Sequence, residues 1–253
     1  MMYPGKPQAR SIRPAHASAS LKNQPVWLFD LDNTLHDSSR EIFKAIDRSM
    51  TAAVASSLDI SAEAANRLRA TYWKRYGATV IGMVRHHGID ANAFLRLSHQ
   101  FDVASMVHAE KGLARKLRQL PGRKFVFTNA PLDYARTVLR TLKILHCFEG
   151  IWAIDDMVLQ GRFRPKPSAA LMRQAVARLG VSAHRVILVE DTLRNLKSAR
   201  QAGMRTAYIY HPQTPFSRGA SGRDQYVDLR VNSIGQLLVG RQAWASLRCI
   251  PPP

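Results

Sequence analysis

Five short apolar runs alternate with helical patterns along this chain, and the alternation limits the possible folds more than any other feature. The runs are residues 26–29 (VWLF), 124–128 (KFVFT), 151–154 (IWAI), 185–190 (RVILVE) and 206–210 (TAYIY). They are apolar nearly throughout, as strands covered on both faces should be. Helical spacing lies between them at 132–142, 168–180 and 192–203. Strand–helix alternation of this kind predicts an α/β fold with a doubly wound parallel sheet.

One long interval, residues 37–118, interrupts this rhythm. It carries four helical patterns and no convincing strand: 40–58, 61–77, 79–88 and 91–101. An insertion of this size directly after the first strand is most simply an α-helical cap over the carboxyl end of that strand, where open α/β sheets bind ligands. We therefore predict a catalytic core built from residues 25–36 and 119–240, with the cap between them.

The two ends of the chain read as tails. Residues 1–24 contain no acidic residue and are dominated by Pro, Ser and Ala, which predicts a disordered basic tail. Residues 241–253 end in three prolines and are expected to be loose as well.

The net charge of +19 over 253 residues predicts attraction to anions. The chain lacks the patterns of a zinc finger, a helix-turn-helix or an aromatic RNA-binding platform, so phosphorylated small molecules are favoured over nucleic acid. No apolar run approaches the roughly 20 residues of a membrane helix. The two cysteines, Cys147 and Cys249, form neither a disulfide framework nor a metal-ligand pattern, which favours a cytosolic, reducing setting.

The first apolar run stops at two carboxylates, Asp30 and Asp32, in FDLDNTL. Alternate side chains of a strand share a face, so both can turn toward one crevice. Such close carboxylates repel each other unless a proton or a cation intervenes, and Mg²⁺ prefers oxygen ligands. An Asp beside a cation can also approach a phosphate and act as a nucleophile. The alternative is a turn followed by a helix N-cap.

Three later strand ends supply complementary groups. FVFTNAP ends in Thr128 and Asn129, a hydroxyl and backbone N–H groups suited to phosphoryl oxygens. FRPKPS presents Lys166 between two prolines, where it can neutralise developing charge. VILVEDT ends in Glu190 and Asp191, which can complete a metal site. Each alone has a structural alternative: a strand-end hydroxyl, a solvated loop charge or helix capping. Their order, each at the end of an apolar strand, favours a shared function.

These motifs resemble those of the haloacid dehalogenase-like hydrolase superfamily: FDLDNTL, FTNA, Lys166–Pro167 and VEDT, in that order. The resemblance spans about residues 26–210 and implies a Rossmann-like core with a helical cap. It also implies a nucleophile at Asp30 and a general acid, then base, at Asp32. True dehalogenases lack the second Asp, so phosphoryl chemistry is implied.

The same resemblance implies the remaining roles. Thr128 and Lys166 would hold the phosphoryl group, and Mg²⁺ would be bound by Asp30, the backbone carbonyl of Asp32 and Asp191. Glu190, where many relatives have Asp, is a further candidate ligand.

A finer resemblance is to the pyrimidine 5′-nucleotidase-like branch. It is carried by Asn33, by YGATVIGMVRHHGID (residues 76–90) and by EDTLRNLKSARQAGM, including Asn195. Ala78 departs from several relatives. The branch implies that Tyr76 and Arg85 line a nucleotide pocket, with Tyr76 stacked on a base. Alternatively, Tyr76 belongs to the cap core, as we expect for Trp73.

The leading hypothesis is a Mg²⁺-dependent phosphomonoester hydrolase that acts through an aspartyl-phosphate, on a small phosphorylated metabolite such as a pyrimidine nucleoside 5′-monophosphate. Three alternatives stay open: a phosphatase of another metabolite or sugar phosphate, a phosphomutase, and a non-enzymatic basic binding protein. Asn33 favours hydrolysis over mutase chemistry, because the family's mutases usually carry Gly there. The intact motifs argue against a binding protein. The sequence leaves the oligomeric state open.

Overall fold

The computed structural model describes residues 24–38, 41–210 and 225–239. The predicted tails, 1–24 and 241–253, therefore lie outside the described residues except for Gln24. None of the described helices combines the length and the apolar character needed to cross a membrane.

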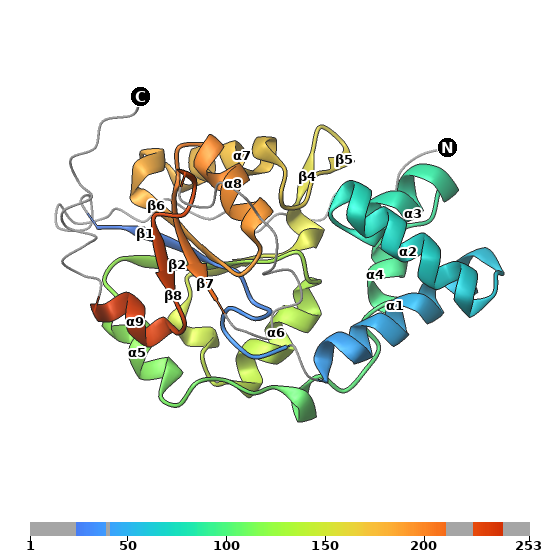
Figure 1. The fold of residues 1–253 in the computed structure, drawn as a ribbon, viewed down its shortest axis with the longest axis horizontal. Coiled ribbons are helices and arrows are strands. Elements are labelled where there is room, and N and C mark those ends of the chain that lie inside the picture. Colours follow the sequence, from blue (N-terminus) through green and yellow to red (C-terminus); the bar gives the residue numbers. More distant parts are fainter. Residues whose placement is uncertain (1–23, 39–40, 211–224, 240–253) are drawn as a thin grey trace.

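A six-stranded sheet forms the centre of the molecule, in the order β3-β2-β1-β6-β7-β8 (Figure 1). All its strand pairs are parallel, so the predicted doubly wound, Rossmann-like α/β fold is confirmed. The strands are β1 (Val26–Phe29), β2 (Arg123–Phe127), β3 (Gly150–Trp152), β6 (Val186–Glu190), β7 (Arg205–Ile209) and β8 (Leu229–Val231). The apolar runs of the sequence predicted all of these strands except β8.

Alternate residues of β1 enter two different hydrophobic clusters. Trp27 and Phe29 pack into one cluster and Val26 and Leu28 into the other, because successive side chains of a strand point to opposite faces. Helices α5 (Leu113–Gln119), α6 (Leu132–Thr141) and α9 (Ile234–Val239) cover the first face, and α7 (Ala169–Leu179) and α8 (Leu193–Gln201) cover the second. Burial on both faces explains why the strands are continuously apolar.

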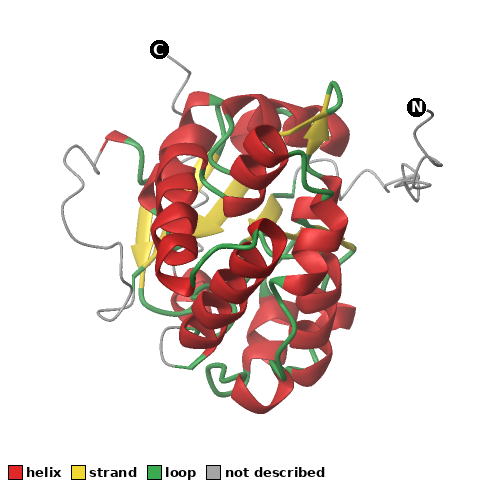
Figure 2. Cartoon of the chain, turned by 90° about the vertical axis from the view of Figure 1, so that its right-hand side faces the viewer, coloured by secondary structure: helices red, strands yellow, loops and turns green. Residues whose placement is uncertain are grey.

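Four helices after β1 pack around a third hydrophobic cluster, and we call them the α1–α4 unit. They are α1 (Ile42–Leu58), α2 (Ala62–Tyr76), α3 (Thr79–His87) and α4 (Ala91–Leu97). Figure 2 views the molecule from the side on which this unit lies. Ser61 caps α2 and Asp90 caps α4 through their side chains. In α3, a Cβ on Gly82 would stand 2.1 Å from the Tyr72 ring, so only glycine allows these helices to approach so closely.

The segment after α4 packs with the sheet. Val103, Leu113 and Leu117 belong to the cluster that contains Trp27. We therefore propose that the boundary between cap and core falls near residue 100 and not at 118. In the opposite direction, Ile154 and Phe163 of the core join the cluster of the α1–α4 unit. Phe163 lies in the hairpin formed by β4 (Val158–Leu159) and β5 (Arg162–Phe163).

Candidate active site

The polar residues predicted from the strand ends meet at one edge of the sheet. Asp30 follows β1, Thr128 follows β2, and Glu190 ends β6. Parallel strands end at the same edge, so these side chains converge there. The backbone continues the sheet's hydrogen bonding at two of these points: Asp30 N donates to Val189 O at 2.9 Å, and Thr128 N donates to Trp152 O at 3.0 Å.

A cavity of about 220 Å³ lies at this edge and is also lined by residues of the α1–α4 unit. Eight of the predicted site residues line it: Asp30, Asp32, Thr128, Asn129, Lys166, Glu190, Asp191 and Asn195. The opposite wall is largely apolar and includes Phe43, Ile46, Met50, Val80, Phe94 and Leu95. The cavity therefore combines a charged floor with an apolar roof.

Lys166 is the buried cation of this site, with 1% of its surface exposed. Its Nζ donates to Asp30 Oδ1 and to Glu190 Oε2, both at 2.7 Å. Burial alone would lower the pKa of Lys166, but Asp30 and Glu190 raise it above its usual value. Lys166 is therefore an ammonium ion held between two carboxylates.

Asn129 fixes the backbone of Lys166. Its Nδ2 donates to Lys166 O at 2.9 Å, and its Oδ1 accepts from Lys166 N at 3.0 Å. The side chain of Asn129 is thus committed to the lysine. Its backbone N–H, which the sequence predicts to contact the phosphoryl group, takes no part in these two bonds.

Asp30, Glu190 and Asp191 form a buried carboxylate cluster whose oxygens lie within 4.8 Å of one another. Burial and the charge of Glu190 raise the pKa of Asp30 to about 8, although Lys166 opposes the shift. Burial and the charges of Glu190 and Asp30 likewise raise the pKa of Asp191 well above its usual value. Three carboxyl groups surround one ammonium ion, and an all-oxygen donor set of this kind fits a hard divalent cation such as Mg²⁺.

Asp32 has a different environment, and its side chain is not part of this cluster. Its Oδ1 accepts hydrogen bonds from Tyr134 Oη at 2.7 Å, Ser38 Oγ at 2.9 Å and His36 Nε2 at 3.0 Å. Burial would raise the pKa of Asp32, but the hydrogen bonds from His36, Tyr134 and Ser38 lower it below its usual value. The pKa values of Asp30 and Asp32, two residues apart, are thus shifted in opposite directions.

Two cap residues predicted to line the cavity, Tyr76 and Arg85, lie outside it. Tyr76 and Arg85, predicted to contact a nucleotide, do not line it among the described residues. Tyr76 Oη instead lies 2.6 Å from His86 Nε2, and the guanidinium of Arg85 lies over the Tyr76 ring, 5.8 Å from its centroid. Trp73, expected in the core, lines the cavity in their place.

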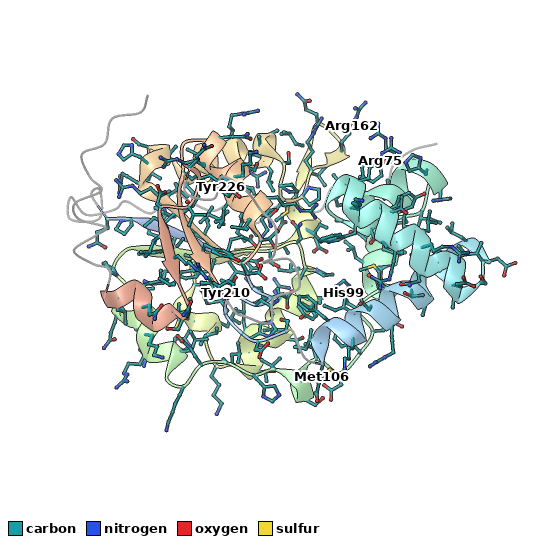
Figure 3. The ribbon with its side chains drawn as sticks, viewed as in Figure 1. Arg75, His99, Met106, Arg162, Tyr210 and Tyr226 are labelled. Carbon is teal, nitrogen blue, oxygen red and sulfur yellow. The ribbon has the colours of Figure 1, made fainter. Side chains whose placement is uncertain are left out.

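Two further cavity residues escaped the sequence analysis. The guanidinium of Arg194, at the start of α8, lies 4.5 Å from the centre of the Trp73 ring. His99 follows α4, and burial lowers its pKa to about 4, so it is neutral at pH 7. Figure 3 labels His99 close to the boundary between the α1–α4 unit and the sheet. A lone Arg or His in a helical pattern gives no signal that distinguishes a cavity residue from a surface residue.

Comparison with known proteins connects this geometry to one family. The family model described as "Hydrolase: haloacid dehalogenase-like hydrolase" matches residues 26–203. The chain is 25% identical to "Phosphate metabolism protein 8" of Saccharomyces cerevisiae over 192 residues, which cover 71% of this chain and 59% of that protein. It is 26% identical to "Phosphoglycolate phosphatase" of Pectobacterium atrosepticum over 219 residues, 79% of this chain and 88% of that one. The chain thus spans less than two thirds of the yeast relative's length.

The fold is also found among solved structures. CbbY from Rhodobacter sphaeroides in complex with phosphate superposes with a TM-score of 0.59 at 20% identity, covering 85% of this chain and 96% of that chain. At this identity the likeness concerns the fold alone.

Proposed function

The chain belongs to the haloacid dehalogenase-like hydrolases, and from that premise we propose that it is a divalent-cation-dependent hydrolase of small phosphomonoesters. One observation carries the proposal: a buried Asp30, hydrogen-bonded to Lys166 and clustered with two further carboxylates, lines a cavity together with Asp32. A nucleophile and a separate acid–base group are what phosphoryl transfer to a carboxylate requires. The name of the Pectobacterium relative, a phosphoglycolate phosphatase, supports the same class.

The carboxylate cluster suits Mg²⁺, the cation predicted from the sequence. Asp30, Asp191 and the backbone carbonyl of Asp32 would hold it. Glu190 already accepts hydrogen bonds from Lys166 Nζ and from Thr192 N. Its main role would therefore be to orient the lysine. When bound, the cation would offset the charge of the cluster and of the phosphate, which otherwise repel each other.

The residues of the chain would then act in two steps. The free oxygen of Asp30 attacks phosphorus, while Lys166 and Thr128 hold the phosphoryl oxygens. The bond to the leaving oxygen breaks, and Asp32, which has to take up a proton from solvent before this step, gives that proton to the leaving oxygen. Asp32 next takes a proton from water, the resulting hydroxide attacks the aspartyl-phosphate, and inorganic phosphate leaves as Asp30 is restored.

Turnover of p-nitrophenyl phosphate with Mg²⁺ and with EDTA tests this proposal. We expect activity only with the cation, and none in Asp30→Asn, whose amide cannot attack phosphorus. Asp133→Asn is the matched control, because its carboxylate lies in α6 with a side chain that is 93% exposed. Appreciable activity in Asp30→Asn would contradict the covalent mechanism, and phosphoryl transfer to a sugar phosphate instead of water would favour the phosphomutase.

For the substrate, we keep pyrimidine nucleoside 5′-monophosphates as the specific proposal, with other small phosphometabolites as the alternative. The support now comes from Trp73, whose ring lines the cavity, and no longer from Tyr76. Trp73→Ala should lower kcat/KM for nucleotides more than for p-nitrophenyl phosphate, by about 10–200-fold. Tyr76→Ala is the matched control outside the cavity. Equal losses on all substrates, or faster turnover of sugar phosphates, would refute the nucleotide assignment.

The cytosolic setting and the absence of a nucleic-acid partner also remain proposals. Both rest on the composition and motifs of the sequence. They are compatible with an enzyme whose partner is a small phosphorylated metabolite.

A further inference from the structure

One oxygen of Asp32 is held by three side chains from two separate parts of the chain. His36 and Ser38 lie in the loop after β1, and Tyr134 lies in α6, 102 residues from Asp32. All three hydrogen bonds end on Oδ1, and no described residue donates a hydrogen bond to Oδ2. The Asp32 side chain is 19% exposed and lines the cavity. The carboxylate is thus anchored by one oxygen and open to the cavity through the other.

We propose that Tyr134 is a positioning residue that holds Asp32 in the orientation required for proton transfer to the leaving oxygen. The inference rests on the proposed function. An Asp side chain turns about two bonds, and proton transfer depends on its reaching the reacting oxygen at hydrogen-bond distance. Anchoring Oδ1 limits these rotations and leaves Oδ2 to meet the substrate.

Tyr134 suits this role better than its two companions. It makes the shortest of the three bonds, at 2.7 Å, and it joins α6 to the β1 loop. A tyrosine hydroxyl has an ordinary pKa of roughly 10 and is protonated at pH 7. The hydroxyl therefore keeps its proton and remains a donor. Ser38 and His36 are local neighbours, so they follow any movement of the loop that carries Asp32.

The ring of Tyr134 is itself fixed by the segment that returns from the α1–α4 unit. His99 packs edge-on against it with ring centroids 5.4 Å apart, and Phe101 lies at 6.1 Å. His99 lines the cavity, whereas Tyr134 does not. Tyr134 thus has no direct path to substrate and acts through Asp32.

Leaving-group dependence distinguishes positioning of an acid from a general structural role. A p-nitrophenolate leaves without a proton, whereas an alkoxide needs one, so only the alkyl ester depends on a well-placed Asp32. Tyr134→Phe removes the hydroxyl and keeps the ring. We expect its kcat/KM to fall at least about tenfold for an alkyl phosphate such as glycerol 3-phosphate, and by less than about threefold for p-nitrophenyl phosphate. We compare kcat/KM because this constant includes every step up to and including departure of the leaving group.

Tyr72→Phe is the matched control. It removes another hydroxyl hydrogen bond, 2.7 Å from Tyr72 Oη to His87 Nε2, within the α1–α4 unit. It should leave the ratio of the two kcat/KM values unchanged. Ser38→Ala removes a second donor to Asp32 and should shift the ratio in the same direction as Tyr134→Phe, which gives a second test that does not depend on residue 134. Inhibition by inorganic phosphate should be unchanged in all three variants.

The outcomes separate the two proposals. Equal losses for both esters, or no change of the ratio in Tyr134→Phe and Ser38→Ala, would overturn the positioning role and leave the phosphatase assignment standing. A wild-type protein that hydrolyses neither ester with Mg²⁺ would refute the proposed function and, with it, this inference.

Discussion

Binding of Mg²⁺ should release about one proton at neutral pH, because the carboxylate cluster holds protons when no cation is present. Burial and Glu190 raise the pKa of Asp30 to about 8, so the protonated fraction at pH 7 is 10/(1 + 10), or roughly 0.9. Asp191, whose pKa is also raised, adds to this number. The cation binds the ionised carboxylates, so the protons must leave. At pH 9 the Asp30 contribution falls to roughly 0.1 of a proton.

The raised pKa of Asp30 also makes the stability of the metal-free protein depend on pH. The folded, metal-free protein holds a proton on Asp30 that an unfolded chain, with an ordinary Asp pKa near 3.9, has lost. Its contribution to stability is therefore largest at low pH and declines as the pH rises from about 4 to 8. Mg²⁺ at saturation should cancel this decline, because its affinity should increase up to about tenfold for each unit by which the pH rises toward 8.

Isothermal titration calorimetry in two buffers of different ionisation enthalpy measures the released protons directly. We expect Asp30 to release about one proton per Mg²⁺ at pH 7 and a much smaller number at pH 9, with any proton held by Asp191 added to each count. Asp133→Asn is the matched control: its carboxylate lies in α6 with a side chain that is 93% exposed, outside the cluster, so its loss should leave the count unchanged. Proton-independent binding with a constant Kd between pH 6 and 9 would refute the reasoning.

Two substitutions and one titration test other parts of the structure. Lys166→Met leaves the carboxylates without their buried cation; the free energy of unfolding in EDTA should fall by about 3–5 kcal/mol, measured by urea denaturation, and a loss below about 1 kcal/mol would contradict the ion-pair geometry. Gly82→Ala forces a Cβ against the Tyr72 ring and should cost about 1–3 kcal/mol in the same assay. His99, with a pKa of about 4, should show no imidazole titration by NMR between pH 6 and 8, and its contribution to stability should fall as the pH drops from 6.5 toward 4.

Local sequence was sufficient for much of the core and for the charged floor of the cavity. The apolar run at 26–29 matches β1 to the residue, and the runs at 124–128 and 185–190 match β2 and β6 within one residue at either end. Strands buried on both faces have to be apolar, which makes them visible. Asp30, Thr128 and Glu190 could then be placed together, because the ends of parallel strands meet at one edge. Helices α5 and α9 and strand β8 were missed, and none of the three is longer than seven residues.

Tertiary structure alone decided which cap side chains reach the cavity and how Asp32 is held. Trp73 and Tyr76 stand three residues apart on α2, yet only Trp73 lines the cavity. Helical periodicity marks apolar positions but does not say which of them meets the core and which meets a ligand. The bond from Tyr134 to Asp32 joins residues 102 apart, and nothing in either local pattern points to the other. The sequence therefore determined which chemical groups stand at the strand ends. Their partners and proton affinities depend on the packing of α6 and the α1–α4 unit against that edge, which sets burial and hydrogen bonding.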